Sequence, residues 1–111
     1  MDLSFGSKKL QRELESAKAM QKAYGQRAAK IKLRLDLLAE STNLADVPST
    51  PPPRCHLLSG DYSGCFAVDI GGNWRLVFKP NHDPVPKLDD GGIDLKKVTA
   101  ICVLEIVDYH G

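Results

Sequence analysis

Apolar residues in the first half of the chain recur at the spacing of an α-helix. The clearest repeat has intervals of three or four residues and comprises Tyr24, Ala28, Ile31, Leu35 and Leu38. Before it, Leu10, Leu14 and Ala17 keep helical spacing after Ser7, whose hydroxyl can cap the N-terminus of a helix. Gly25 interrupts the pattern. The first half therefore predicts two helices, divided near Gly25, that form a hairpin with an apolar inner face.

In the second half the apolar period changes to two, the period of a β-strand. Six large apolar residues alternate with other residues on either side of a glycine-rich turn: Phe66, Val68, Ile70, Trp74, Leu76 and Phe78. If Gly71–Asn73 forms a three-residue hairpin loop, all six lie on one face, with Ile70 opposite Trp74. Arg75 then lies on the other face, across from Asp69.

Two further segments predict strands. Asp2–Phe5 suits a short first strand, and Val98–Tyr109 is apolar at nearly every position until Glu105, as in the middle of a sheet. Eighteen residues, 80–97, connect the hairpin to this last strand, a length typical of functional or mobile loops. The order of strand, two helices and antiparallel strands predicts an α+β fold with the helices packed on one face of the sheet.

The 111 residues fit a single domain. Within it we predict a helical half at about 7–47, a proline-rich connector at 48–54 and a sheet half at 55–110. The formal net charge is only +1, yet residues 7–34 hold nine Lys or Arg and two Glu. This basic helical surface either binds a polyanion or is an ordinary solvated face.

The three cysteines, Cys55, Cys65 and Cys102, show no CxxC pair and no tight spacing with histidine. This pattern argues against a disulfide framework and a structural zinc site, and we expect neither a metal nor a cofactor. No apolar signal core or stretch of membrane-spanning length occurs in the sequence. We therefore expect a cytoplasmic protein without membrane association.

Three motifs carry a family resemblance: "HLLSGD" at 56–61, "NWRLVF" at 73–78 and "VDYH" at 107–110. Together with the basic helices they resemble the RelE/ParE toxin superfamily, most closely the HigB type of plasmid-maintenance killer proteins. The matching residues are His56, Leu58, Gly60, Asp61 and Gly64, then Asn73, Trp74, Arg75 and Phe78, then Asp108, Tyr109 and His110. The resemblance implies a short strand, two helices and an antiparallel sheet, in agreement with the hydrophobic pattern.

The resemblance also implies a function. Such toxins cut mRNA, usually in the ribosomal A site, and are held inactive by a small antitoxin encoded beside them. It therefore implies the toxin of a type II toxin-antitoxin system. The implied partners are a helix-turn-helix antitoxin, the ribosome and mRNA, with operator DNA bound only through the antitoxin.

Metal-free RNA cleavage requires that the ribose 2'-OH lose a proton and attack phosphorus, and that the leaving 5'-oxygen gain a proton. His56 and His110 are the candidates for these transfers near neutral pH. Asp108 could orient either histidine, and Tyr109 could stack on a base or donate its phenolic proton. We expect the last strand to bring Asp108 and His110 to the sheet edge that carries the other site residues, although alternation places Tyr109 on the opposite strand face.

Cations must stabilise the charge that develops on phosphorus. Arg75 can donate two parallel hydrogen bonds to a phosphate, or it can instead pair with Asp69 across the strands. Ser59 stands where the resembling toxins generally carry a lysine, and Lys79 is the nearest substitute cation in the sequence. The predicted RNA-binding residues are Ser59, Lys79, Lys30, Lys32 and Arg34.

Two alternatives to RNA cleavage stay open. Ser59 and the near-neutral sheet half favour a non-catalytic member of the same fold that binds antitoxin or poisons DNA gyrase. A small helix-plus-sheet adaptor with no toxin role is the other alternative.

Overall fold

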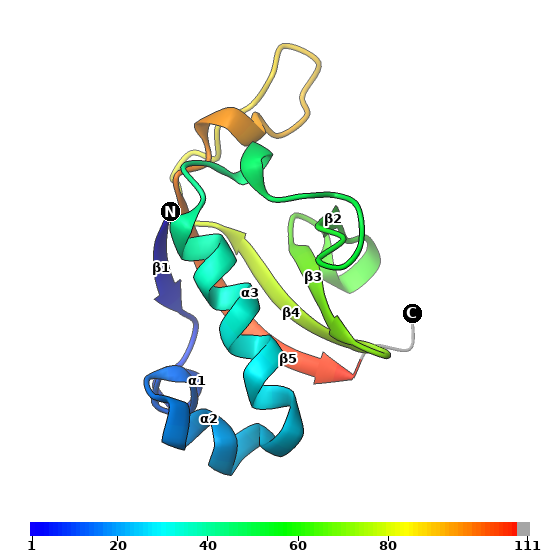
Figure 1. Ribbon diagram of the computed structural model, residues 1–111. Helices are drawn as coiled ribbons and strands as arrows, with labels where there is room; N and C mark the ends of the chain where they lie inside the picture. Colours follow the sequence, from blue (N-terminus) through cyan, green and yellow to red (C-terminus); the bar gives the residue numbers. More distant parts are fainter. Residues whose placement is uncertain (109–111) are drawn as a thin grey trace.

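The computed structural model describes residues 1–108, which form a five-stranded sheet with helices on one face (Figure 1). In chain order the elements are β1 (Asp2–Phe5), α1 (Lys8–Leu14), α2 (Ala17–Tyr24), α3 (Ala28–Glu40), β2 (His56–Leu57), β3 (Phe66–Gly71), β4 (Trp74–Pro80) and β5 (Ala100–Asp108). The strands lie in the order β1-β5-β4-β3-β2. This arrangement confirms the predicted α+β fold with a short N-terminal strand.

The helical half holds three α-helices rather than the two predicted. The predicted break at Gly25 is present as a 3-10 turn, Gly25–Arg27, between α2 and α3. A second break separates α1 from α2, because the Ser16 hydroxyl accepts a hydrogen bond from the Ala19 amide at 3.0 Å and caps a new helix. Ser7 caps α1 in the same way, as predicted.

Replacing Ser16 by alanine should lower the free energy of unfolding by about 1 kcal/mol, since the Ala19 amide in the first turn of α2 loses its side-chain acceptor. Urea denaturation followed by circular dichroism would measure the loss. Replacement of Ser49, an exposed serine of the connector, is the matched control and should change stability by less than about 0.5 kcal/mol. Equal effects of the two substitutions would contradict the capping role.

The sheet is mixed rather than wholly antiparallel. β1 runs parallel to β5, with Leu3 opposite Ile101, whereas the other neighbouring strands are antiparallel. A parallel pair of strands needs a long connection between them, and here the helices and the other strands separate β1 from β5 in the chain. In the sheet β5 lies between β1 and β4, which confirms its predicted place inside the sheet.

The register of the β3–β4 hairpin agrees with the prediction except at the turn. Val68 lies opposite Leu76 and Asp69 opposite Arg75, but Trp74 pairs with Gly71 rather than with Ile70. The pairing shifts between Asp69 and Gly71, as in a β-bulge. Gly71 (φ 111°) and Gly72 (φ 56°) both take positive φ values, which glycine adopts without steric cost.

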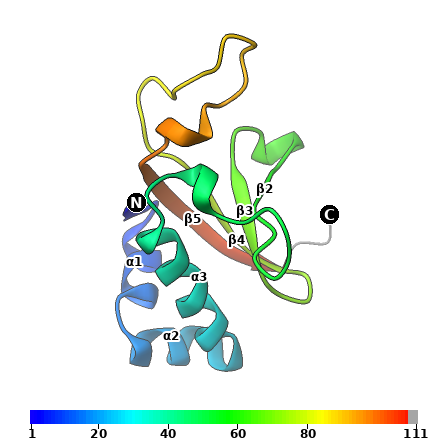
Figure 2. The ribbon, with the colours of Figure 1, turned by 45° about the horizontal axis from the view of Figure 1, so that its top comes forward.

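The main hydrophobic core lies between the helices and one face of the sheet, and Figure 2 shows α3 lying along that face. Ile31 and Leu38 of α3 are fully buried there, as are Leu76 and Phe78 of β4. The six predicted hairpin residues all belong to this core or pack against it. The two apolar patterns read from the sequence therefore meet at one interface.

The long connection after β4 projects from one end of the molecule (Figures 1 and 2). His82 ties it to the sheet, because its Nε2 accepts hydrogen bonds from the amides of Thr99 and Ala100 at 3.1 and 3.3 Å. A bridge between Lys87 and Ile93 closes the tip of the loop. The segment is thus anchored at its base on β5.

Candidate functional site

The sheet face turned away from the helices, which we call the open face, carries several of the predicted site residues. Cross-strand pairing aligns His56, Ala67, Val77 and Glu105 in one row across β2–β5. Side chains of directly opposed residues lie on the same face of a sheet. Ala67 and Val77 are fully buried and form a small apolar floor with Leu58 of the neighbouring loop. His56 and Glu105 lie at the two sides of this floor.

His56 makes one polar contact that sets the chemistry of its ring. Its Nδ1 lies 2.7 Å from the Arg54 carbonyl oxygen. A carbonyl only accepts hydrogen bonds, so Nδ1 carries the proton and donates it. In the neutral imidazole Nε2 is then unprotonated and can accept a proton, which is the property required of a general base.

Arg75 lies in the next row of the open face and pairs with Asp69, which is the alternative role that the sequence left open. Its Nε lies 2.9 Å from Asp69 Oδ1, and its Nη1 donates to the carbonyls of Gly72 and Trp74, each at 2.9 Å. The Arg75 side chain is only 13% exposed. These contacts fix the guanidinium in place and use part of its donor capacity within the protein.

Asp69 also binds a second arginine. Arg54 Nε and Nη2 donate to its two carboxylate oxygens at 2.8 and 3.1 Å. This hydrogen bonding with Asp69 raises the pKa of Arg54 further above its ordinary value, so the guanidinium stays charged. One carboxylate therefore holds two guanidinium groups, and the cluster keeps an excess positive charge beside His56.

The three cationic residues predicted on α3 point in different directions. Arg34 Nε donates to the Asp69 carbonyl at 2.7 Å and so reaches the edge of β3. Lys32 instead pairs with Asp36 at 2.8 Å on the exposed side of the helix. Lys30 lines a pocket beside Gly71. The structure thus brings Arg34 to the Asp69 cluster but leaves Lys32 apart from it.

Lys79 and Ser59, the other two residues predicted to bind RNA, are both exposed. Lys79 lies two residues beyond Val77 on β4 and is opposite Cys102. Burial raises the pKa of the nearby Cys65 thiol, and the charges of Lys79 and Glu105 act on it in opposite directions. Ser59 precedes the short 3-10 turn Gly60–Tyr62, and Tyr62 packs against the apolar floor.

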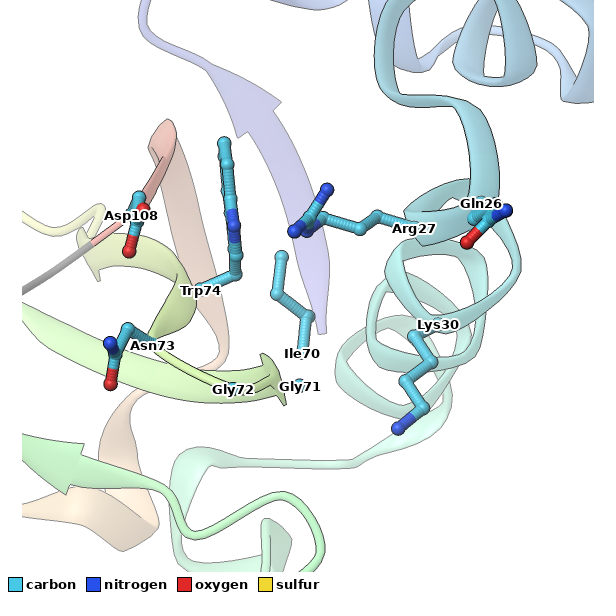
Figure 3. Close-up of a pocket in the computed structure, with 9 residues that line it drawn as sticks. All are labelled: Gln26, Arg27, Lys30, Ile70, Gly71, Gly72, Asn73, Trp74 and Asp108. Atoms are coloured by element: carbon cyan, nitrogen blue, oxygen red, sulfur yellow. The ribbon is translucent and has the colours of Figure 1, made fainter.

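Asp108 lies on the helix-covered face, opposite to the face of His56 and Arg75. It pairs with Trp74, whereas Arg75 pairs with Val107. It lines a pocket of about 490 Å³ between the start of α3 and the β3–β4 turn, shown in Figure 3. The expectation that β5 brings Asp108 to the site of His56 and Arg75 is therefore not met, because the register places the Asp108 side chain on the same face of the sheet as Trp74.

The pocket beside Asp108 combines an aromatic ring with cations. The Arg27 guanidinium lies over the Trp74 ring, 4.4 Å from its centroid, and Figure 3 shows Asp108 on the other side of the indole. A cation–π contact of this kind stabilises the approach of the 3-10 turn to the sheet. Tyr109 and His110, the remaining predicted catalytic residues, lie outside the described residues.

Comparison with known proteins identifies the architecture. No model of a known protein family matches the chain, and no curated protein sequence matches it. Among solved structures, the YoeB/ParE toxin from Agrobacterium tumefaciens matches with a TM-score of 0.57 over 99% of this chain and 100% of that chain. The chain shares the fold of this YoeB/ParE toxin. The sequence identity is 13%, so this likeness establishes the RelE/ParE-like fold alone.

Sequence reasoning missed two residues of the open face, Arg54 and Glu105. Arg54 follows three prolines and belongs to no periodic pattern, so only the chain path reveals that it reaches Asp69. Glu105 is a charged residue in the otherwise apolar run of β5, and the sequence shows this interruption. Its alignment with His56, however, depends on a register shift opposite Val77 and Phe78. Strand alternation alone could not place it.

Within residues 1–108, no three histidine, cysteine or carboxylate side chains gather closely enough to ligate a metal ion. The helices in that range are all too short or too polar to cross a membrane.

Cys55, next to His56, is held as a neutral thiol. Burial raises its pKa to about 11. A thiol whose folded pKa lies above its unfolded value stabilises the fold at lower pH and loses that contribution as pH rises through the interval between the two values. Between about pH 9 and pH 11 the wild type should therefore lose unfolding free energy that the Cys55→Ala variant does not lose. Urea denaturation of both proteins at several pH values measures the difference, and parallel curves would contradict it.

Proposed function

We propose that the chain is the toxin of a type II toxin-antitoxin system and cleaves mRNA on the ribosome, in the manner of the HigB-type toxins that its motifs resemble. The observation that carries the proposal is the open face of a RelE/ParE-like fold, where His56, whose Nδ1 contacts the Arg54 carbonyl, lies beside the arginine cluster at Asp69. A general base next to fixed cations suits attack by a ribose 2'-OH.

The spacing of these groups fits an RNA phosphodiester. His56 lies two strands from Val77, and Arg75 and Lys79 lie two residues to either side of Val77. Neighbouring strands lie about 4.8 Å apart and the rise is about 3.3 Å per residue, so the Cα atoms of Arg75 and Lys79 each lie roughly 12 Å from the Cα of His56. The side chains of Arg75 and Lys79 are long enough to span part of that distance, and the space that remains between their cationic groups and the His56 ring fits one nucleotide linkage.

In the proposed reaction His56 Nε2 takes the proton of the 2'-OH, and the 2'-oxygen attacks phosphorus. The bond from phosphorus to the 5'-oxygen breaks, and the leaving oxygen gains a proton from a donor for which His110 is the predicted residue. The products are a 2',3'-cyclic phosphate and a 5'-hydroxyl. Lys79 supplies the mobile positive charge that Ser59 does not, while Arg75 contributes a fixed one.

A second candidate function is a non-catalytic toxin that poisons DNA gyrase or binds antitoxin alone. Two observations favour it: Arg75 is engaged with Asp69 and two carbonyls, and Asp108 lies on the opposite face. Both limit the number of groups that can act on one phosphate.

Induced expression in a bacterium, followed by mapping of mRNA 5' ends, separates these candidates. The cleavage proposal predicts growth arrest with new 5' ends at preferred codons. Growth arrest without new ends, combined with inhibition of gyrase in a supercoiling assay, would support the second candidate and overturn the first. Co-expression of the cognate helix-turn-helix antitoxin that the proposal implies should restore growth in either case.

A further inference from the structure

We propose that Arg54 is a positioning residue that fixes His56 in the tautomer whose Nε2 is free to accept a proton. The catalytic consequence rests on the function proposed above, whereas the tautomer itself does not. Three separate features of Arg54 support the proposal: its backbone conformation, its bidentate contact with Asp69 and the hydrogen bond between its carbonyl and the histidine ring.

The Arg54 backbone is unusual. Its φ is 47°, and within residues 1–108 it is the only non-glycine residue with positive φ. A side chain with a Cβ rarely adopts this left-handed region, because Cβ then crowds the following carbonyl. Such a conformation persists only where the surroundings hold it, and it often marks a functional position.

Contacts on both sides of Arg54 hold this conformation. Its amide donates to the Thr50 carbonyl at 3.0 Å, and the preceding Pro53 carbonyl accepts from the Asp69 amide at 2.7 Å. Its guanidinium is clamped by both oxygens of the Asp69 carboxylate. The backbone and side chain of Asp69 therefore tie the end of the connector to β3.

The consequence falls on His56, two residues later. With the left-handed turn at Arg54, its carbonyl lies within 2.7 Å of Nδ1 on the His56 ring. A free imidazole exchanges between two neutral tautomers, and a fixed acceptor at Nδ1 selects the form with the proton there. The Nε2 lone pair is left to face a substrate on the open face.

Long-range nitrogen–proton correlation NMR reads the tautomer directly, without any substrate. Spectra of uniformly labelled protein at about pH 8.5, above the ordinary pKa range of imidazole, should show His56 as the Nδ1-protonated form. The signal is assigned by its loss in His56→Gln. In Arg54→Ala the clamp is gone and alanine disfavours positive φ, so the two tautomers should both be populated.

Arg54→Gly and Arg34→Ala complete the design. Glycine adopts positive φ readily, so Arg54→Gly should retain more of the Nδ1-protonated form than Arg54→Ala does. Arg34→Ala also removes an arginine that contacts Asp69, but only at its carbonyl, and should leave the tautomer unchanged. Thermal unfolding of each variant confirms that it is folded.

The results decide the role of Arg54 independently of RNA cleavage. A wild-type His56 protonated at Nε2, or an Arg54→Ala spectrum identical to wild type, would overturn the proposal. If Arg54→Gly populates the Nδ1-protonated tautomer no more than Arg54→Ala does, the role of the left-handed backbone is contradicted. If RNA is cleaved, Arg54→Ala should lower kcat about 10-fold with little change in KM, since orientation rather than binding is lost. A wild type that cleaves no RNA contradicts the proposed function but leaves the tautomer result intact.

Discussion

Replacing His56 by alanine is expected to lower the rate of ribosome-dependent mRNA cleavage by about 10²- to 10⁴-fold, the usual contribution of a general base. The reason is that Nε2 of His56 is the proton acceptor that the arrangement on the open face provides, with Nδ1 occupied by the Arg54 carbonyl. The ring is half-buried on the short edge strand β2, so its removal should cost little stability. Cleavage is measured with purified ribosomes and a defined message, and folding by circular dichroism.

His82→Ala is the matched control for that experiment. His82 accepts hydrogen bonds from the amides of Thr99 and Ala100 at the base of the long loop, beyond the end of β4 and outside the open-face row. Its replacement should lower stability modestly but change the cleavage rate of the folded protein by less than about 3-fold. A His56→Ala protein with wild-type cleavage would remove His56 from the chemistry.

Replacing Asp69 by alanine is expected to be the most damaging single change to the open face. Its carboxylate pairs with Arg54 and Arg75. The substitution removes the anion that the largely buried guanidinium of Arg75 contacts. Breaking a fully buried pair costs about 3–5 kcal/mol, but the Asp69 side chain is 23% exposed, so we expect about 2 kcal/mol. Cleavage should fall as well, because both arginines lose their fixed positions.

Asp36→Ala tests whether the loss is specific. Asp36 also pairs with a basic residue, Lys32, but the two side chains are 51% and 56% exposed on the surface of α3. An exposed pair four residues apart on a helix contributes only about 0.3–0.5 kcal/mol. Urea denaturation at low and high salt compares the variants, and equal losses in Asp69→Ala and Asp36→Ala would show that the central carboxylate does not organise the arginines.

Hydrophobic periodicity predicted most of the scaffold because burial follows directly from it. Ile31 and Leu38 of α3, and Val68 and Leu76 of the hairpin, occupy the core positions that their spacing indicates. The second helix break at Ser16 escaped prediction, because a serine inside an apolar repeat is compatible with both a continuous helix and a new cap.

The site was harder to predict because it depends on long-range geometry. Alternation correctly placed Arg75 opposite Asp69, yet only the fold shows that Arg54 shares the same carboxylate. The face of Asp108 depends on the register between β4 and β5, which shifts by one residue between Val77 and Phe78. Such a shift moves every later side chain of the strand to the other face, and apolar content alone gives no sign of it.

The chemistry of the cut ends tests the central claim most directly. Purified wild-type protein is incubated with ribosomes and a defined mRNA, and the two new termini are identified by their sensitivity to kinase and phosphatase. The proposed reaction predicts a 5'-hydroxyl on the downstream fragment and a 2',3'-cyclic phosphate on the upstream one, both forming at least about 100-fold more slowly with His56→Ala. Fragments with a 5'-phosphate, or intact message beside inhibited gyrase, would contradict it.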